Sequence, residues 1–236
     1  MSGYAVWLYG SEARGDALPG SDIDILLVGD APPPIDLSGR FPGRRISLSC
    51  YEWKEINRMA QYGSLFLHHI RLEAKMLFES FEAEGKLQSQ LDHLPCYQRA
   101  ARDVRAFRQS LRDIASELPH PPAMEFELAT LAALVRRIAI LGCYLLGCPL
   151  FDRTGPVAKV VEAWKLPSQF ASDFPNLYRY RLAADDLGTV TTVPDAAILL
   201  AWVKRTRLLL DNLEAETYEF YDSLPRSNPT GARAGR

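Results

Sequence analysis

The hydrophobic positions in the first third of the chain form short runs and a two-residue alternation, both typical of β-strands. Tyr4–Tyr9 is an apolar run that ends just before a glycine, and Ile23–Val28 is a second run rich in aliphatic residues. Arg45–Tyr51 alternates apolar and small polar residues, which predicts a third strand. Two helices and a short fourth strand are predicted after it, over Tyr51–Tyr62, Ser64–Glu73 and Ala74–Phe78.

From about Leu94 the apolar residues recur at helical spacing instead. The segments expected to form helices or short helical elements are Tyr97–Leu118, Glu125–Leu146, Pro156–Trp164, Leu166–Asp173, Pro175–Ala184 and Pro194–Asp222. The most apolar run, Leu128–Leu146, is interrupted by Arg136 and Arg137, which favours a buried helix over a membrane span. We therefore expect no membrane partner.

This change of pattern predicts an α+β protein with two domains. Residues 1–92 are expected to form a small domain around a mixed sheet, and residues 93–224 an all-α helical bundle. The last residues, 225–236, are small, polar and basic, and we expect a disordered tail there.

Composition narrows the class of protein without identifying it. The chain has 236 residues, 47% of them hydrophobic and 24% charged, which excludes disordered and fibrous proteins. Its net charge of −2 argues against a protein that coats nucleic acid or an acidic membrane, but leaves a local nucleic-acid groove open. The N-terminus does not look like a signal peptide, and the four cysteines form no CxxC pair, so we expect a cytoplasmic protein with reduced thiols.

The segment after the first predicted strand has the residues of an anion site. Gly10 lacks a side chain, so a phosphate can approach the backbone amides that follow it. Ser11 offers a hydroxyl, and the helical turn after it presents amide donors and a positive dipole end. Arg14 adds a cation, and together these groups predict a phosphate-binding turn.

Two carboxylates follow at a spacing that suits a metal ion. Asp22 and Asp24 are two residues apart, so on a strand they point to the same face. Side by side they repel each other unless a cation lies between them, and Mg²⁺ takes carboxylate and phosphate oxygens. We therefore predict that Asp22 and Asp24 are metal ligands and catalytic residues in transfer at an α-phosphorus.

The whole segment resembles the Gly-Ser-x10-Asp-x-Asp signature of the polymerase-β-like nucleotidyltransferases. It is most similar to the minimal type found in bacteria and archaea, which includes antitoxins paired with helical RNase toxins. The matching residues are Gly10, Ser11, Arg14, Gly15, Ser21, Asp22 and Asp24. The resemblance implies that Gly10, Ser11, Arg14 and Ser21 hold the nucleotide and that both aspartates bind Mg²⁺. It also implies an N-terminal nucleotidyltransferase domain that moves a nucleoside monophosphate from a nucleoside triphosphate, with ATP as the expected donor.

One position departs from the family pattern. The family carries a third carboxylate on the strand after the Asp-x-Asp strand, where it binds metal and activates the acceptor hydroxyl. Here that strand contains Ser47 and Ser49 but no acid. Glu52 after the strand or Asp36 before it replaces that group only if the loops bring it to the metals. If neither does, the acceptor is activated otherwise, or the protein binds nucleotide with weak or no turnover, as an antitoxin-like or regulatory protein would.

The remaining polar candidates add less. His68 and His69 have no acids or thiols at metal-ligand spacing, so we do not expect them to bind metal. Arg136 and Arg137 suit either a phosphate or a pairing within the bundle. The helical half lacks the Arg-x4–6-His motif of helical RNases, so we expect a substrate-binding or interface role for it. The acceptor is left open between a protein hydroxyl, a small molecule such as an aminoglycoside, and an RNA end.

Overall fold

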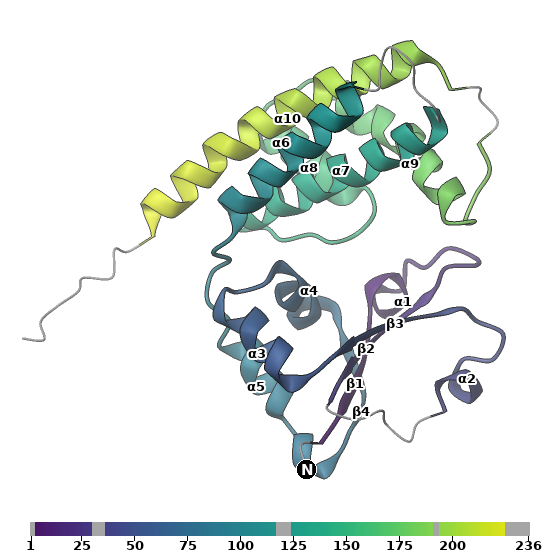
Figure 1. The fold of residues 1–236 in the computed structure, drawn as a ribbon, viewed down its shortest axis with the longest axis vertical. Coiled ribbons are helices and arrows are strands. Elements are labelled where there is room, and N and C mark those ends of the chain that lie inside the picture. Colours follow the sequence, from purple (N-terminus) through teal and green to yellow (C-terminus); the bar gives the residue numbers. More distant parts are fainter. Residues whose placement is uncertain (1–2, 30–35, 117–123, 191–193, 225–236) are drawn as a thin grey trace, which may run out of the picture.

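The computed structural model describes residues 3–29, 36–116, 124–190 and 194–224. Its sheet has four strands in the order β3-β2-β1-β4 (Figure 1). The strands are β1 (Ala5–Tyr9), β2 (Ile23–Val28), β3 (Ile46–Tyr51) and β4 (Lys75–Glu79). β1 runs antiparallel to β2 and β4, whereas β2 and β3 are parallel, so the sheet is mixed as the sequence predicts.

Helices cover the two faces of the sheet unequally. One face packs against α3 (Trp53–Gln61), α4 (Leu65–Glu73) and α5 (Lys86–Asp92), of which α5 was not predicted. The other face packs against the short helix α2 (Leu37–Arg40) (Figure 1). Alternate residues of β2 supply both cores, because successive strand residues point to opposite faces. A 3-10 turn, η1, spans Phe81–Ala83.

The described residues after Asp92 form helices and connecting segments without strands. The helices are α6 (Ala100–Ser116), α7 (Met124–Leu145), α8 (Gly155–Ala163), α9 (Gln169–Ala184) and α10 (Ala196–Ser223). α7 contacts the other four, which explains why its apolar residues surround the whole helix. By length and composition α7 is the one described helix that is long and apolar enough to cross a membrane, yet most of it is buried inside the fold.

The region around Pro175 corrects a prediction. We expected two short elements on either side of this proline, but α9 runs through it without a break. Phe170, Phe174 and Leu177 are buried in the core of the helices. Each such side chain contributes roughly 1.5–3 kcal/mol when fully buried, so the three together outweigh the ~3 kcal/mol that an interior proline costs a helix. Tertiary packing, rather than local propensity, therefore decides the course of α9.

The buried hydrophobic residues form three clusters. The largest draws only on residues between Tyr97 and Leu213, and the other two draw only on residues between Ala5 and Leu91. The division of the chain at residues 92 and 93 remains a proposal, and we name the two sides the sheet unit and the helical unit. The predicted tail at 225–236 lies outside the described residues.

Candidate active site

The turn that leaves β1 passes directly beside Asp24. β1 and β2 pair so that Tyr9 lies opposite Asp24. Gly10 follows Tyr9 in the chain and therefore lies beside Asp24. Gly10 has φ +71°, and a Cβ built on it would lie 2.4 Å from Oδ2 of Asp24. A side chain at this position would strain the backbone and collide with the carboxylate. Gly10 is thus required by both the backbone conformation and the close approach.

Residues Gly10–Arg14 form the short helix α1, which lies between the sheet and the helical unit (Figure 1). Ser11 is buried, and its carbonyl accepts hydrogen bonds from the amides of Gly15 and Asp16 at 2.9 and 3.0 Å. Gly15 ends the turn in the left-handed conformation with φ +86°. Residues Gly10–Arg14 therefore fold as one helical turn with backbone amides at its start, and phosphate binding by this turn stays a prediction.

The two aspartates lie at the start of β2. Asp24 is partly buried and its backbone pairs with Ser47 on β3. Burial raises the pKa of the Asp24 carboxyl, and the charge of Asp22 adds to that effect. A hydrogen bond with Ser47 and the charges of His69 and Arg14 oppose the shift only in part. The folded protein thus destabilises the ionised form of Asp24. This is expected for a carboxylate whose charge is balanced by a bound cation rather than by a side chain.

Asp22 is held by an arginine that the sequence analysis missed. The amide of Ile23 donates to the carbonyl of Arg45 at 2.8 Å, which sets the parallel register and places Arg45 beside Asp22. Nε of Arg45 donates to Oδ1 of Asp22 at 2.5 Å, and Nη2 donates to the carbonyl of Asp185 at 3.3 Å. Arg45 therefore joins Asp22 to the C-terminal end of α9. An arginine one residue before a strand parallel to the Asp-x-Asp strand was the available signal.

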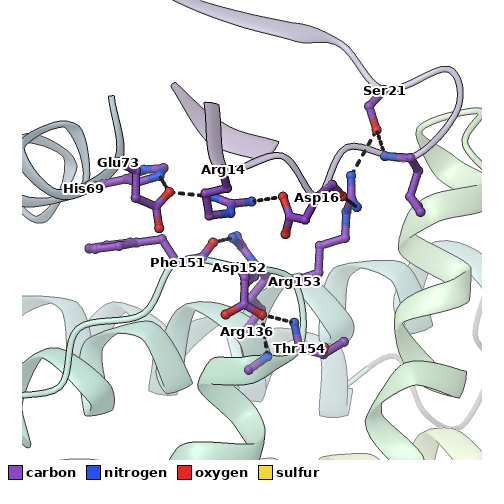
Figure 2. A network of polar contacts seen from close by, with 12 residues as sticks. Arg14, Asp16, Ser21, His69, Glu73, Arg136, Phe151, Asp152, Arg153 and Thr154 are labelled. Carbon is purple, nitrogen blue, oxygen red and sulfur yellow. Dashed lines mark hydrogen bonds and ion pairs between the residues drawn. The ribbon is translucent and has the colours of Figure 1, made fainter. Parts of the chain in front are cut away.

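Ser21 forms a hydrogen bond with an arginine of the helical unit. Its side chain is buried, and Oγ accepts hydrogen bonds from the Leu18 amide and from Nη2 of Arg153, both at 3.0 Å. Nη1 of Arg153 donates to the carbonyl of Asp16 at 3.1 Å (Figure 2). The segment between α7 and α8 thus closes over the loop that joins α1 to β2.

Arg14 points toward α4 and is neutralised there. Its guanidinium lies 2.6 Å from the Glu73 carboxylate and 3.2 Å from that of Asp16 (Figure 2). His69 lies 2.8 Å from the same Glu73 oxygen and stacks on Phe151, with 4.4 Å between the ring centroids. Burial alone would raise the pKa of Glu73, but its hydrogen bonds with His69 and Arg14 outweigh burial and lower that pKa. The cluster links α1, α4 and the helical unit.

Arg136, on α7, bonds to the segment between α7 and α8. It donates to the backbone carbonyls of Phe151 and, at 3.0 Å, of Asp152 (Figure 2). Burial lowers the pKa of Arg136, and the charges of Arg14 and Arg153 act in the same direction. Among the described contacts, Arg136 and Arg153 bond to carbonyls and a hydroxyl rather than to carboxylates. Two guanidinium charges from the helical unit therefore remain close to α1, and an anionic ligand would balance them.

The strand expected to carry the third carboxylate is β3, which places Ser47 opposite Asp24 and contains no acid. Glu52 follows β3 and caps α3, about 17 Å along the strand from Ser47 at ~3.3 Å per residue. Asp36 caps α2, where it accepts from the Gly39 amide at 2.9 Å. Each of these acids thus bonds to the start of its own helix. No group of three or more acids, histidines or cysteines placed to hold a metal occurs in the part of the chain that the structure describes.

The donor set nevertheless fits a magnesium–nucleotide. Asp22 and Asp24 offer carboxylate oxygens on one side of β2. Helix α1 begins at Gly10, which lies in close contact with the Asp24 carboxylate, so the first amides of α1 are next to the same site. Mg²⁺ commonly binds through one or two carboxylates together with substrate phosphates rather than through an all-protein cage. Two aspartates without a third are therefore chemically compatible with a metal–nucleotide.

Comparison with known proteins finds a family match in the sheet unit. Residues 2–91 match the family model of the nucleotidyltransferase domain. A solved spectinomycin adenyltransferase from Enterococcus faecialis shares 13% identity at a TM-score of 0.48, covering 89% of this chain and 92% of that one. A nucleotidyltransferase-like protein from Exiguobacterium sibiricum shares 14% at a TM-score of 0.42, covering 93% and 72%. No curated protein matches the chain. The family expected from the Gly10–Asp24 motif is confirmed for the sheet unit: residues 2–91 are a nucleotidyltransferase domain.

Proposed function

We propose that this protein is an Mg²⁺-dependent nucleotidyltransferase that moves a nucleoside monophosphate from a nucleoside triphosphate, ATP being the expected donor, to an acceptor hydroxyl. The observation that carries the proposal is the contact between the Gly10 turn and Asp24, where even a methyl group would collide with the carboxylate. This contact brings a phosphate-binding turn and a metal-binding acid into one site.

The roles of the residues follow from their positions. Asp22 and Asp24 would hold Mg²⁺, which when bound neutralises phosphate charge and polarises the α-phosphorus for attack. Gly10 and the amides after Ser11 would orient the phosphate chain. Ser21 and Arg14 border the same loop, although their polar groups already bond to Arg153 and Glu73. Arg136 and Arg153 would supply positive charge from the helical unit.

A second candidate is a nucleotide-binding protein with weak or no turnover. The specific observation in its favour is β3, the strand on which the resemblance implies a third carboxylate: it places Ser47 opposite Asp24 and contains no acid. A hydroxyl at this position neither binds metal as strongly as a carboxylate nor takes a proton from an acceptor at neutral pH. Regulation or antitoxin-like binding of a protein partner would then be the function.

Two measurements separate these candidates. Calorimetry with a non-hydrolysable ATP analogue, with and without Mg²⁺, tests binding, and absence of Mg²⁺-dependent binding would reject both. Transfer of label from the α-phosphate of ATP is then tested with protein, aminoglycoside and RNA acceptors. Transfer that is lost in both Asp22→Asn and Asp24→Asn supports the enzyme. Binding without transfer to any of the three acceptor classes supports the second candidate.

A further inference from the structure

The guanidinium of Arg45 takes the place beside Asp22 where a metal ion would be needed. Its Nε lies 2.5 Å from Oδ1 of Asp22, a close, charge-assisted hydrogen bond. Its side chain is 54% exposed and that of Asp22 is 31% exposed, so solvent ions can reach both groups. Arg45 is therefore an internal counter-ion at an accessible metal-binding carboxylate.

The same side chain also contacts the helical unit. Nη2 of Arg45 donates to the carbonyl of Asp185, the residue that follows the last turn of α9. The C-terminal end of a helix carries partial negative charge, so it attracts the guanidinium independently of Asp22. The carboxylate of Asp185 is paired with Arg181 at 2.8 Å, which fixes the helix end that Arg45 contacts. Arg45 thus bonds to the two units at once.

We propose that Arg45 is a positioning residue that holds Asp22 and the end of α9 together when the site is empty, and that Mg²⁺ must displace its guanidinium from Asp22 to bind. The inference rests on the proposed function, because it takes Asp22 as a metal ligand. Two cations at one carboxylate repel each other, and Mg²⁺ requires oxygen ligands at about 2.0–2.1 Å in octahedral geometry. Metal binding and the contact between Arg45 and Asp22 therefore oppose one another.

A consequence for the helical unit follows from linkage. If release of Asp22 loosens the junction at α9, then metal binding and the α9 contact are coupled, and each weakens the other by the same factor. The coupling is modest, because an exposed ion pair changes an equilibrium by at most about fivefold. Arg45 would thereby let the state of the metal site adjust how firmly the helical unit is held.

The test is the Mg²⁺ concentration at which binding of a non-hydrolysable ATP analogue is half-maximal. In Arg45→Ala we expect this midpoint to fall by about two- to fivefold, because the competing cation is gone. Arg44→Ala is the matched control: it removes one positive charge from the neighbouring position, where Arg44 bonds to Glu12 and the Ser21 carbonyl rather than to a metal ligand. Its midpoint should stay at the wild-type value.

Hydrogen exchange of residues 183–188 is the second readout. In the wild type, exchange there should speed up when Mg²⁺ and the analogue are added, whereas Arg45→Ala should exchange quickly from the start. Arg45→Lys keeps the charge but cannot bond to both groups, so its midpoint should stay near wild type while exchange rises. A midpoint that is unchanged or higher in Arg45→Ala would overturn the proposal while leaving the proposed function intact. Wild-type protein that binds no nucleotide with Mg²⁺ would instead overturn the proposed function itself.

Discussion

Replacing Gly10 with alanine should damage the site far more than the fold. The left-handed backbone at φ +71° costs an L-residue about 1–2 kcal/mol, which lowers the melting temperature by about 2–8 °C in a chain of this size. In addition, the new Cβ would lie 2.4 Å from Oδ2 of Asp24, whereas ordinary contact begins at 3.4 Å. The carboxylate or the turn must therefore move by about 1 Å to restore ordinary contact.

A displacement of about 1 Å in a catalytic group costs on the order of 10²-fold in rate, and we expect this loss in Mg²⁺-dependent transfer of labelled nucleotide. Binding of the ATP analogue, followed by calorimetry, should weaken in parallel.

Gly85→Ala is the matched control for the backbone strain. Gly85 has φ +66° and no atom within 4 Å of its built Cβ, and it lies in the sheet unit away from Asp24. Gly85→Ala should lose a similar 1–2 kcal/mol of stability but keep wild-type nucleotide binding. The reasoning is refuted if Gly10→Ala binds Mg²⁺ and nucleotide as tightly as Gly85→Ala does.

Three further changes test other parts of the site. Ser47→Asp places an acid opposite Asp24, so transfer should increase at saturating Mg²⁺; an unchanged rate would argue against a role for this position. Burial raises the pKa of Asp24 in the folded protein. The stabilisation of the fold by the protonated carboxyl is therefore complete below the unfolded-state pKa and is lost as pH rises through the folded-state pKa. Asp24→Asn should therefore melt above wild type at pH 7 in EDTA, with a gap that closes toward pH 4 and no Mg²⁺ response. Arg153→Ala removes a cation beside Ser21, and calorimetry should show analogue binding weakened about tenfold, equivalent to ~1.4 kcal/mol; unaltered affinity would exclude a phosphate role.

Much of the sheet unit could be predicted locally. β2 was predicted with the bounds that the structure has, and β1, β3 and β4 to within one residue. These strands follow from the period of their apolar residues, which is a property of neighbouring positions in the chain. The prediction failed where distant packing dominated, as at Pro175, because the burial of Phe174 and its neighbours cannot be read from the sequence around a proline.

The candidate site divides in the same way. Its motif residues Gly10, Asp22 and Asp24 were found from spacing, since a phosphate turn and paired acids require particular residue types at short separations. The arginines that bond to Asp22 and to the neighbouring Ser21 were not found. Arg153 lies 132 positions from Ser21, and Arg45, which bonds to Asp22, also contacts Asp185, 140 positions away.

The sequence by itself determined the family of the sheet unit, the strand that begins beside the two aspartates, and the absence of an acid from the following strand, which has Ser47 and Ser49 instead. All of these depend on residue identity and on spacing within about 40 positions. Only the tertiary structure decided that Arg45 bonds to Asp22 and Arg153 to Ser21, because the first contact depends on the pairing register of β2 and β3 and the second on the packing of the helical unit against the sheet unit. It also decided why Gly10 must be glycine, since the 2.4 Å approach to Asp24 exists only once β1 and β2 have paired.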